Sequence, residues 1–435
     1  ALFVARRAAA VAVSATRGDL PAPPITLLAG NGVQLRLLAA LHAAAGDGIV
    51  VLEEPHGLDA LDAVDRPVFV ASSPGSCALV DRVDRVVVAV EAGAPVDASL
   101  AAVVRARAAS GLGAQLVVVH ETQLSAAGAG VIADEWGIDD VINVDLGDRR
   151  DMRRLARVLT DRPRALVLGA GGARAFAQIG AIRALEEAGA EFDIVVGSGF
   201  GAVIGAQYAL GWTADELLAR NRAAWSVRGR MPTLPSLSAF SGASVAGLLR
   251  RWFGARDIAD TRMQFRPCVT DLSDNVSRTM TRGPLADWVR AAAATPGLYP
   301  PHVVDGHLYV DGSVVDPLPA GHARELGAAT VYAVDTRPLR RHTTESSQVR
   351  PPEGVSWFVQ SIPVIGSGFP SVFALVEHAL SASQARHQAE LRERCDLVIE
   401  PPVDRYGVLD FGAADALAEI GYLEAVRRLE ERRDG

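Results

Sequence analysis

The sequence contains no lysine: all 43 basic side chains other than histidine are arginine, against 51 aspartate and glutamate residues, for a formal net charge of −8. General nucleic-acid binders need clustered cationic side chains that neutralise phosphates. A net negative chain therefore predicts no nucleic-acid partner. The exclusive use of arginine, with abundant alanine, valine and glycine, is more typical of a GC-rich genome than of a particular function.

Cysteine is also scarce, and Cys77, Cys268 and Cys395 stand alone, without a Cys-x-x-Cys pair or a Cys/His cluster. This spacing predicts neither a disulfide framework nor a zinc site, so we expect no metal, no cofactor and a reducing cytoplasm. The sequence also has no signal peptide and no apolar run of about 20 residues that could span a bilayer. Peripheral contact with a membrane stays open. Because the chain starts at Ala1 rather than Met, we expect a longer protein with an additional N-terminal domain.

A chain of 435 residues is too long for one ordinary core, so we expect two domains, at residues 1–161 and 162–435. The first alternates short β-branched runs with helical segments, which predicts a smaller Rossmann-like α/β domain with a parallel sheet. Its glycines at 30 and 32 indicate a turn rather than a nucleotide site, because no complete dinucleotide motif follows a strand. Predicted strands cover 9–14, 49–52, 68–71, 86–90 and 116–119, and predicted helices cover 33–45 and 98–109.

An arginine-rich helix is predicted at residues 148–160. We interpret it as a solvated linker helix whose arginines pair with Asp148 and Asp151, and contact with acidic lipid headgroups is the alternative. Later in the chain, residues 228–241 are predicted to form a mobile loop over a pocket, and 337–352 a disordered loop. Residues 355–380 are either a lid or membrane-docking surface, or a core helix with a buried hairpin.

Residues 165–206 carry the most informative pattern in the chain. An apolar strand at 165–168 runs into a glycine loop and then a helix at 176–188. A second strand at 192–196 turns through closely spaced glycines into a helix at 202–210, which is typical of a nucleophile elbow. The backbone N–H groups of such a glycine loop can stabilise an oxyanion. The plainer interpretation is a strand-to-helix turn of any α/β fold. The loop residues are Gly169, Ala170, Gly171, Gly172 and Arg174, and the elbow residues are Gly197, Ser198, Gly199 and Gly201.

These two loops resemble those of the patatin-like phospholipase family, in particular its bacterial branch similar to neuropathy target esterase. The resemblance covers residues 164–430 well and the first domain loosely. It implies a three-layer α/β/α domain, a serine hydrolase fold with esterase or (lyso)phospholipase activity in lipid metabolism, and a Ser–Asp dyad. The family's nucleophilic serine falls on Gly199, between Gly197 and Gly201, so the nucleophile is missing.

The resemblance assigns the dyad aspartate to Asp311, which precedes Gly312 after an apolar run. By itself such a dipeptide most often marks a hairpin turn. Without a serine at 199 this carboxylate has no catalytic partner, and Asp316 is the weaker substitute. The chain departs from the family pattern at further positions, namely Ala170, Ala175, Gln178 and Ser313.

Two expectations concern the side chains around the elbow. Ser198 is one residue from the nucleophile position, and a one-residue shift at a strand end turns a side chain to the opposite face. We therefore expect Ser198 to point away from the pocket and to cap the following helix. Ala170 and Ala175 are expected to strain the glycine loop wherever it needs a positive φ.

Two functions remain open. The first is a patatin-fold pseudoenzyme that binds lipid, or regulates, without hydrolysis. The second is an active lysophospholipase or carboxylesterase whose serine was replaced at 199, or is supplied by Ser198 or another nucleophile. Whether Gly199 is the native residue decides between them, and we expect Gly199→Ser to regain little activity because the glycine loop is altered too. The acyl chain, the headgroup and the oligomeric state do not follow from the sequence.

Overall fold

The computed structural model describes residues 25–29, 37, 50–53, 67–71, 85–93, 98–109, 114–120, 128–228, 242–337 and 388–434. The predicted strand at 9–14 and the segment at 355–380 lie outside these residues. The predicted helix at 33–45, the loop at 228–241 and the loop at 337–352 also lie outside them, apart from one residue each.

The first sheet is six-stranded and all its described pairings are parallel, in the order β2-β3-β1-β4-β5-β6. Val86 and Val88 face one core and Val87 and Ala89 face the other, as the two-residue period of a strand requires. The predicted Rossmann-like parallel sheet is confirmed, although β1 and β6 were not predicted. The elements are β1 (Ile25–Ala29), β2 (Val50–Glu53), β3 (Pro67–Ala71), β4 (Arg85–Glu91), α4 (Ala98–Ala109), β5 (Ala114–His120), α5 (Ala129–Trp136), β6 (Asp140–Asp145) and α6 (Arg149–Leu159).

Helix α6 begins after Asp148, whose side chain accepts a hydrogen bond from the amide of Arg150 at 2.7 Å. The predicted pairing is present, since Arg154 meets Asp151 at 2.7 Å and both are buried. The interpretation as a solvated linker helix is wrong. Leu155 and other apolar residues of α6 pack in the core of the first sheet, so burial holds the helix there.

The second sheet has eight strands in the order β11-β12-β9-β8-β7-β13-β14, with β10 paired to β9. The five strands from β9 to β14 along this order are parallel, whereas β10, β11 and β12 run antiparallel to their neighbours. Its strands are β7 (Arg164–Leu168), β8 (Ile194–Gly197), β9 (Gln264–Asp271), β10 (Val276–Thr279), β11 (His302–Val304), β12 (His307–Asp311), β13 (Thr330–Val334) and β14 (Leu397–Ile399).

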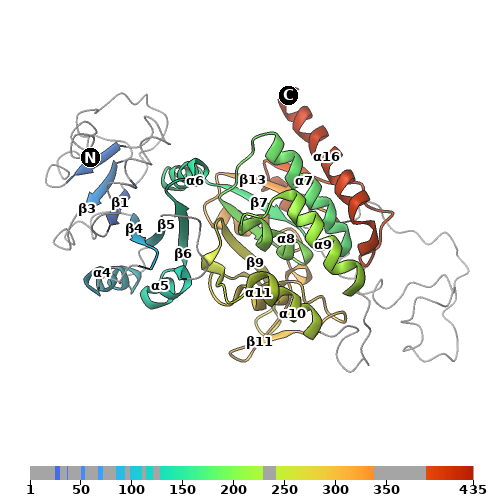
Figure 1. Cartoon of the computed structure of the whole chain (residues 1–435), viewed down its shortest axis with the longest axis horizontal. Helices are drawn as coiled ribbons and strands as arrows, with labels where there is room; N and C mark the ends of the chain where they lie inside the picture. Colours follow the sequence, from blue (N-terminus) through green and yellow to red (C-terminus); the bar gives the residue numbers. More distant parts are fainter. Residues whose placement is uncertain are drawn as a thin grey trace, which may run out of the picture.

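Helices cover both faces of the second sheet, which makes the predicted three-layer α/β/α arrangement. In β7, Leu166 and Leu168 face the core shared with α7, α8, α9 and α16, whereas Ala165 and Val167 face α12. Figure 1 shows α7, α9 and α16 side by side on the first of these faces. The helices are η4 (Gly172–Ala175), α7 (Phe176–Glu187), α8 (Phe200–Ala209), α9 (Ala214–Arg228), α10 (Gly242–Phe253), η5 (Ile258–Asp260), α11 (Leu285–Ala292), η6 (Gly312–Val314), α12 (Ala320–Glu325), α15 (Gln388–Glu393), η7 (Phe411–Ala413) and α16 (Ala414–Asp434).

Polar contacts join the two sheets. Asn143 of β6 donates from Nδ2 to the carbonyl oxygens of Ala259 at 2.7 Å and Thr261 at 2.9 Å, next to η5. Arg262 forms an ion pair with Asp151 of α6 at 2.8 Å. The division at residues 161 and 162 stays a prediction. Among the described residues, no helix combines the length and the apolar character that crossing a bilayer requires.

Candidate functional site

A cavity of about 150 Å³ opens where β7, β8 and β12 end. The three loops that leave these strands supply Ala170 to Gly172, Gly199, and Asp311 with Ser313 to its wall. In open α/β sheets, ligands bind outside the carboxyl ends of the parallel strands. The sheet thus brings together the glycine loop, the elbow and the aspartate, although Gly169 and Asp311 lie about 140 residues apart along the chain.

Gly199 lies at the sharp turn between β8 and α8, with φ 59° and ψ −136°. This positive-φ conformation suits glycine and costs any other residue free energy. A Cβ at position 199 would point across the cavity, 3.3 Å from Oδ1 of Asp311. A side chain at this position would therefore face the carboxylate, as the resemblance implies for the missing serine.

The same Cβ would lie 2.9 Å from Cβ and 3.2 Å from Cα of Ala170. Real Cβ atoms essentially never approach another atom this closely, and the Ala170 methyl group cannot rotate away. The alanine in the glycine loop and the glycine in the elbow therefore fit each other. The Ala170 methyl group thus takes up space that a side chain at position 199 would need, a relation that the spacing of the two residues in the sequence could not reveal.

The glycine loop offers fewer free donors than the sequence indicates. Gly169 and Ala170 donate their amide N–H groups to the carbonyl oxygens of Val334 at 3.0 Å and Pro317 at 2.9 Å. Within the described part of the chain, the amides of Gly171 and Gly172 have no protein acceptor and lie at the cavity wall. These two groups are the ones that can donate to an oxygen of a ligand.

The expected strain at the alanines of the loop is wrong. Ala175 has φ −63°, and Ala170 is absent from the described non-glycine residues with positive φ. The loop is instead supported from behind, because Nε2 of buried Gln178 donates to the carbonyl oxygen of Gly169 at 2.5 Å. Buried Arg174 donates from Nε to the carbonyl oxygen of Gly171 at 3.3 Å.

Asp311 is buried at the end of β12, and its carboxylate already has partners. Oδ2 accepts a hydrogen bond from the Thr295 hydroxyl at 2.7 Å, and Oδ1 accepts one from the amide of Ser313 at 2.8 Å. Burial raises the pKa of the Asp311 carboxyl, although these hydrogen bonds oppose the shift. The sequence analysis did not identify Thr295, and no local signal marks it as a partner of Asp311.

Ser198 points away from the cavity. Its hydroxyl is fully buried and donates to the carbonyl oxygen of Asp316 at 3.0 Å. The expected helix cap is wrong, because α8 has Gly199 as its N-cap residue and no side-chain cap. Neither Ser198 nor Asp316 lines the cavity, so in this arrangement Ser198 does not take the place of a serine at 199 and Asp316 does not take the place of Asp311.

Most of the remaining cavity wall is apolar. Phe200 and Trp225 meet edge to face with ring centroids 5.0 Å apart, and Phe411 stacks on Trp225 at 5.6 Å. Leucine, valine and proline side chains complete this wall. Three arginines also line the cavity, Arg174, Arg290 and Arg337, and Arg337 forms an ion pair with Asp335 at 2.6 Å. Among the described residues, the lining combines apolar side chains with these arginines and one carboxylate, that of Asp311.

Comparison with known proteins agrees with this arrangement. The family model described as patatin-like phospholipase matches residues 166–324, which include the glycine loop, the elbow and Asp311. A protein named lysophospholipase NTE1 from Phaeosphaeria nodorum is 34% identical over 292 residues, covering 64% of this chain and 19% of the relative. Patatin-like phospholipase domain-containing protein 7 from Rattus norvegicus is 33% identical over 284 residues, covering 62% of this chain and 21% of the relative.

The chain thus spans about a fifth of the length of these curated relatives. Among solved structures, VipD from Legionella pneumophila aligns with a TM-score of 0.34 and 11% identity, covering 62% of this chain and 67% of that one. This similarity is too low to support a comparison of the two sites.

Proposed function

Because the segment around the cavity belongs to the patatin-like phospholipase family, we propose that this protein binds a lipid in a phospholipase fold without hydrolysing it. It acts as a lipid-binding or regulatory module. The relatives that carry the name lysophospholipase suggest the ligand class, a phospholipid with one acyl chain.

The observation that carries this proposal is Gly199. The elbow conformation and the buried Asp311 are present, but no hydroxyl projects from position 199 toward the carboxylate. A covalent acyl-enzyme cannot form without a nucleophile there, and losing such a serine costs a serine protease roughly 10⁶-fold in rate. The Thr295 hydroxyl now satisfies the carboxylate, which leaves Asp311 a structural acceptor.

The cavity wall fits a lipid with an anionic headgroup. The apolar part, with Phe200, Trp225 and Phe411, suits an acyl chain because burial of hydrocarbon contributes about 25 cal/mol per Å². Arg174 and Arg290 line the same cavity, and arginine side chains suit a phosphate oxygen because they form charge-assisted hydrogen bonds to phosphate. Such a lipid would come from a membrane surface, and peripheral contact with a cytoplasmic membrane face belongs to the proposal.

An active enzyme is the alternative, and it requires a nucleophile other than residue 199. Ser198 is disfavoured, because its hydroxyl is buried and donates to Asp316 on the far side of the loop from the cavity. A fluorophosphonate serine-hydrolase probe and a p-nitrophenyl ester assay test both functions on the purified chain. We expect neither labelling nor turnover.

Binding is tested with a fluorescent lysophospholipid that carries a phosphate headgroup. Val245 of α10 lines the cavity, so Val245→Trp is expected to fill it and to weaken binding at least tenfold. Val131→Trp on α5 is the matched control, because Val131 is 71% exposed and belongs to the first sheet's helices. Saturable binding that only Val245→Trp weakens would support the proposal. Turnover of the ester, or binding that both variants retain equally, would overturn it.

A further inference from the structure

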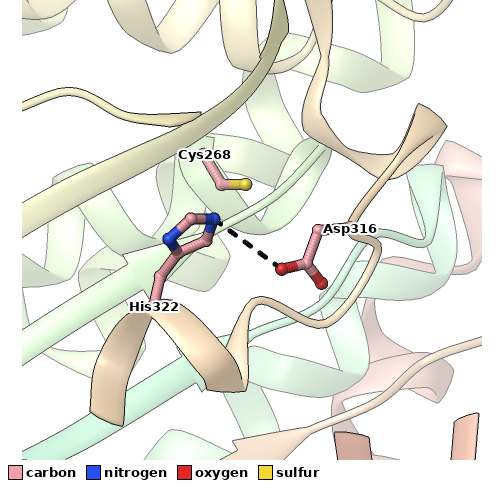
Figure 2. A group of neighbouring side chains, drawn as sticks. All are labelled: Cys268, Asp316 and His322. Atoms are coloured by element: carbon pink, nitrogen blue, oxygen red, sulfur yellow. Dashed lines mark ion pairs between the residues drawn. The ribbon is translucent and has the colours of Figure 1, made fainter. Parts of the chain in front are cut away.

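A second group of side chains lies on the far side of the Asp311 loop from the cavity. Cys268 comes from β9, Asp316 from the segment after η6, and His322 from α12, and Figure 2 shows their side chains converging. Their possible ligand atoms all lie within 4.8 Å of one another, and Nε2 of His322 is 3.9 Å from Oδ2 of Asp316. None of these residues lines the lipid cavity.

The burial of these groups leaves one polar atom without a partner. The Cys268 side chain is fully buried, whereas Asp316 and His322 keep 15% and 18% of their side-chain surface exposed. Oδ1 of Asp316 is buried and accepts no hydrogen bond among the described residues. An unsatisfied buried acceptor costs about 1–3 kcal/mol, and the other oxygen of the same carboxylate, Oδ2, is the one that faces His322.

A thiolate and a carboxylate can lie side by side when a divalent cation lies between them, because their charges then balance that of the metal.

The histidine is oriented as a metal ligand would be. Nδ1 of His322 lies 3.1 Å from Oε2 of Glu325, one turn later in α12, which holds Nε2 toward Cys268 and Asp316. A carboxylate on the distal ring nitrogen is the usual outer partner of a metal-bound histidine. The Ser277 hydroxyl lies between two of these groups, 2.8 Å from Nε2 of His322 and 3.3 Å from Sγ of Cys268. A bound ion would either displace this hydroxyl or be coordinated by it.

We propose that Cys268, Asp316 and His322 bind a Zn²⁺ ion. Thiolate, imidazole and carboxylate together select zinc over the hard cations Mg²⁺ and Ca²⁺, which prefer oxygen ligands alone. With zinc–sulfur and zinc–nitrogen distances of about 2.3 and 2.0 Å, tetrahedral ligands lie roughly 3.5 Å apart, so small side-chain rotations close the site. Ser277 or a water molecule completes the fourth position.

Such an ion would brace the cavity from behind. It joins β9 and α12 to the segment after η6, whose Asp316 accepts the Ser198 hydroxyl and whose Pro317 accepts the amide of Ala170. The ion therefore restrains both loops beside Gly199. This role is independent of whether the cavity holds a lipid.

The test uses the full chain, stripped with a chelator under reducing conditions and titrated with Zn²⁺ and then Co²⁺. We expect one tight equivalent, with a thiolate-to-cobalt charge-transfer absorption that requires the cysteine. His322→Gln and Cys268→Ser are each expected to weaken zinc binding at least about 100-fold, since loss of an outer partner alone costs 10–100-fold. His322 is partly exposed, so that variant is expected to fold even where Cys268→Ser does not.

Two matched controls accompany these variants. Cys395→Ser removes the other free cysteine among the described residues, and His307→Gln alters the separate Asp271, Asp274 and His307 group. Both are expected to keep the cobalt absorption and the zinc affinity. Absence of the charge-transfer band, or unchanged affinity in His322→Gln, would overturn the proposal.

Discussion

The contact between positions 170 and 199 predicts that a serine nucleophile can be restored only together with a second change. In Gly199→Ser, the new Cβ would approach Cβ of Ala170 to 2.9 Å. Overpacking of this kind costs about 1–3 kcal/mol, and a positive φ at a non-glycine residue costs a further 1–3 kcal/mol. The single variant is therefore expected to be less stable and to hold its hydroxyl away from Asp311.

Replacing Ala170 with glycine removes the first of these costs. The closest remaining contacts of the new Cβ would be 3.2 Å to Cα of residue 170 and 3.3 Å to Oδ1 of Asp311. Ala170→Gly itself costs about 0.4–1 kcal/mol in chain entropy. We therefore expect a coupling free energy of about 1–3 kcal/mol between the two substitutions, since contacting residues couple by 0.5–3 kcal/mol.

Urea unfolding of the wild type, both single variants and the double variant measures this coupling. Fluorophosphonate labelling measures whether the hydroxyl reaches Asp311, and we expect at least tenfold faster labelling in the double variant than in Gly199→Ser. A tenfold rate change corresponds to about 1.4 kcal/mol. The control pairs Gly199→Ser with Ala175→Gly, because Ala175 is helical and is not among the nearest neighbours of position 199. Zero coupling, or equal labelling in the double variant and this control, would refute the reasoning.

Three further predictions concern stability. Burial raises the folded-state pKa of Asp311, so folding favours its protonated form, and the free energy of unfolding should fall as pH rises from about 3.8 through that raised value. Asp311→Asn is expected to remove this pH dependence. Parallel plots of unfolding free energy against pH for the wild type and the variant between pH 4 and 8 would contradict it. Ser198→Ala should cost about 1 kcal/mol, from the lost hydrogen bond to Asp316, and leave probe labelling unchanged, whereas labelling lost in this variant would identify Ser198 as a nucleophile. Gly180→Ala should cost at least about 1–3 kcal/mol, because a Cβ there would overlap the carbonyl oxygen of Ala418 where α7 crosses α16, and a thermal midpoint equal to wild type would show that the helices separate without cost.

Local patterns in the sequence were sufficient for the elements and for the loops that carry the site. Apolar runs predicted the strands β2, β3, β4, β5, β7 and β8, and the glycines at 197, 199 and 201 predicted the sharp turn into α8. Each of these signals is contained within a few consecutive residues. The missed strand β6 and the solvated interpretation of α6 share one cause. Both depend on burial against a sheet assembled from distant segments, which no local window contains.

The sequence by itself determined that residue 199 has no hydroxyl, and no structure can restore one. Only the tertiary structure decided which groups lie around Gly199. Ala170 fills the space beside Gly199, the Thr295 hydroxyl donates to the carboxylate of Asp311, and the Ser198 hydroxyl donates to the carbonyl oxygen of Asp316. Residues 170 and 199 are roughly 30 positions apart, and residues 198 and 316 are about 120 positions apart. Thr295 and Asp311 are closer in sequence, with Thr295 before the β11–β12 hairpin and Asp311 at its end. The distances of these contacts follow from sheet order and strand length, which are set when the whole domain packs.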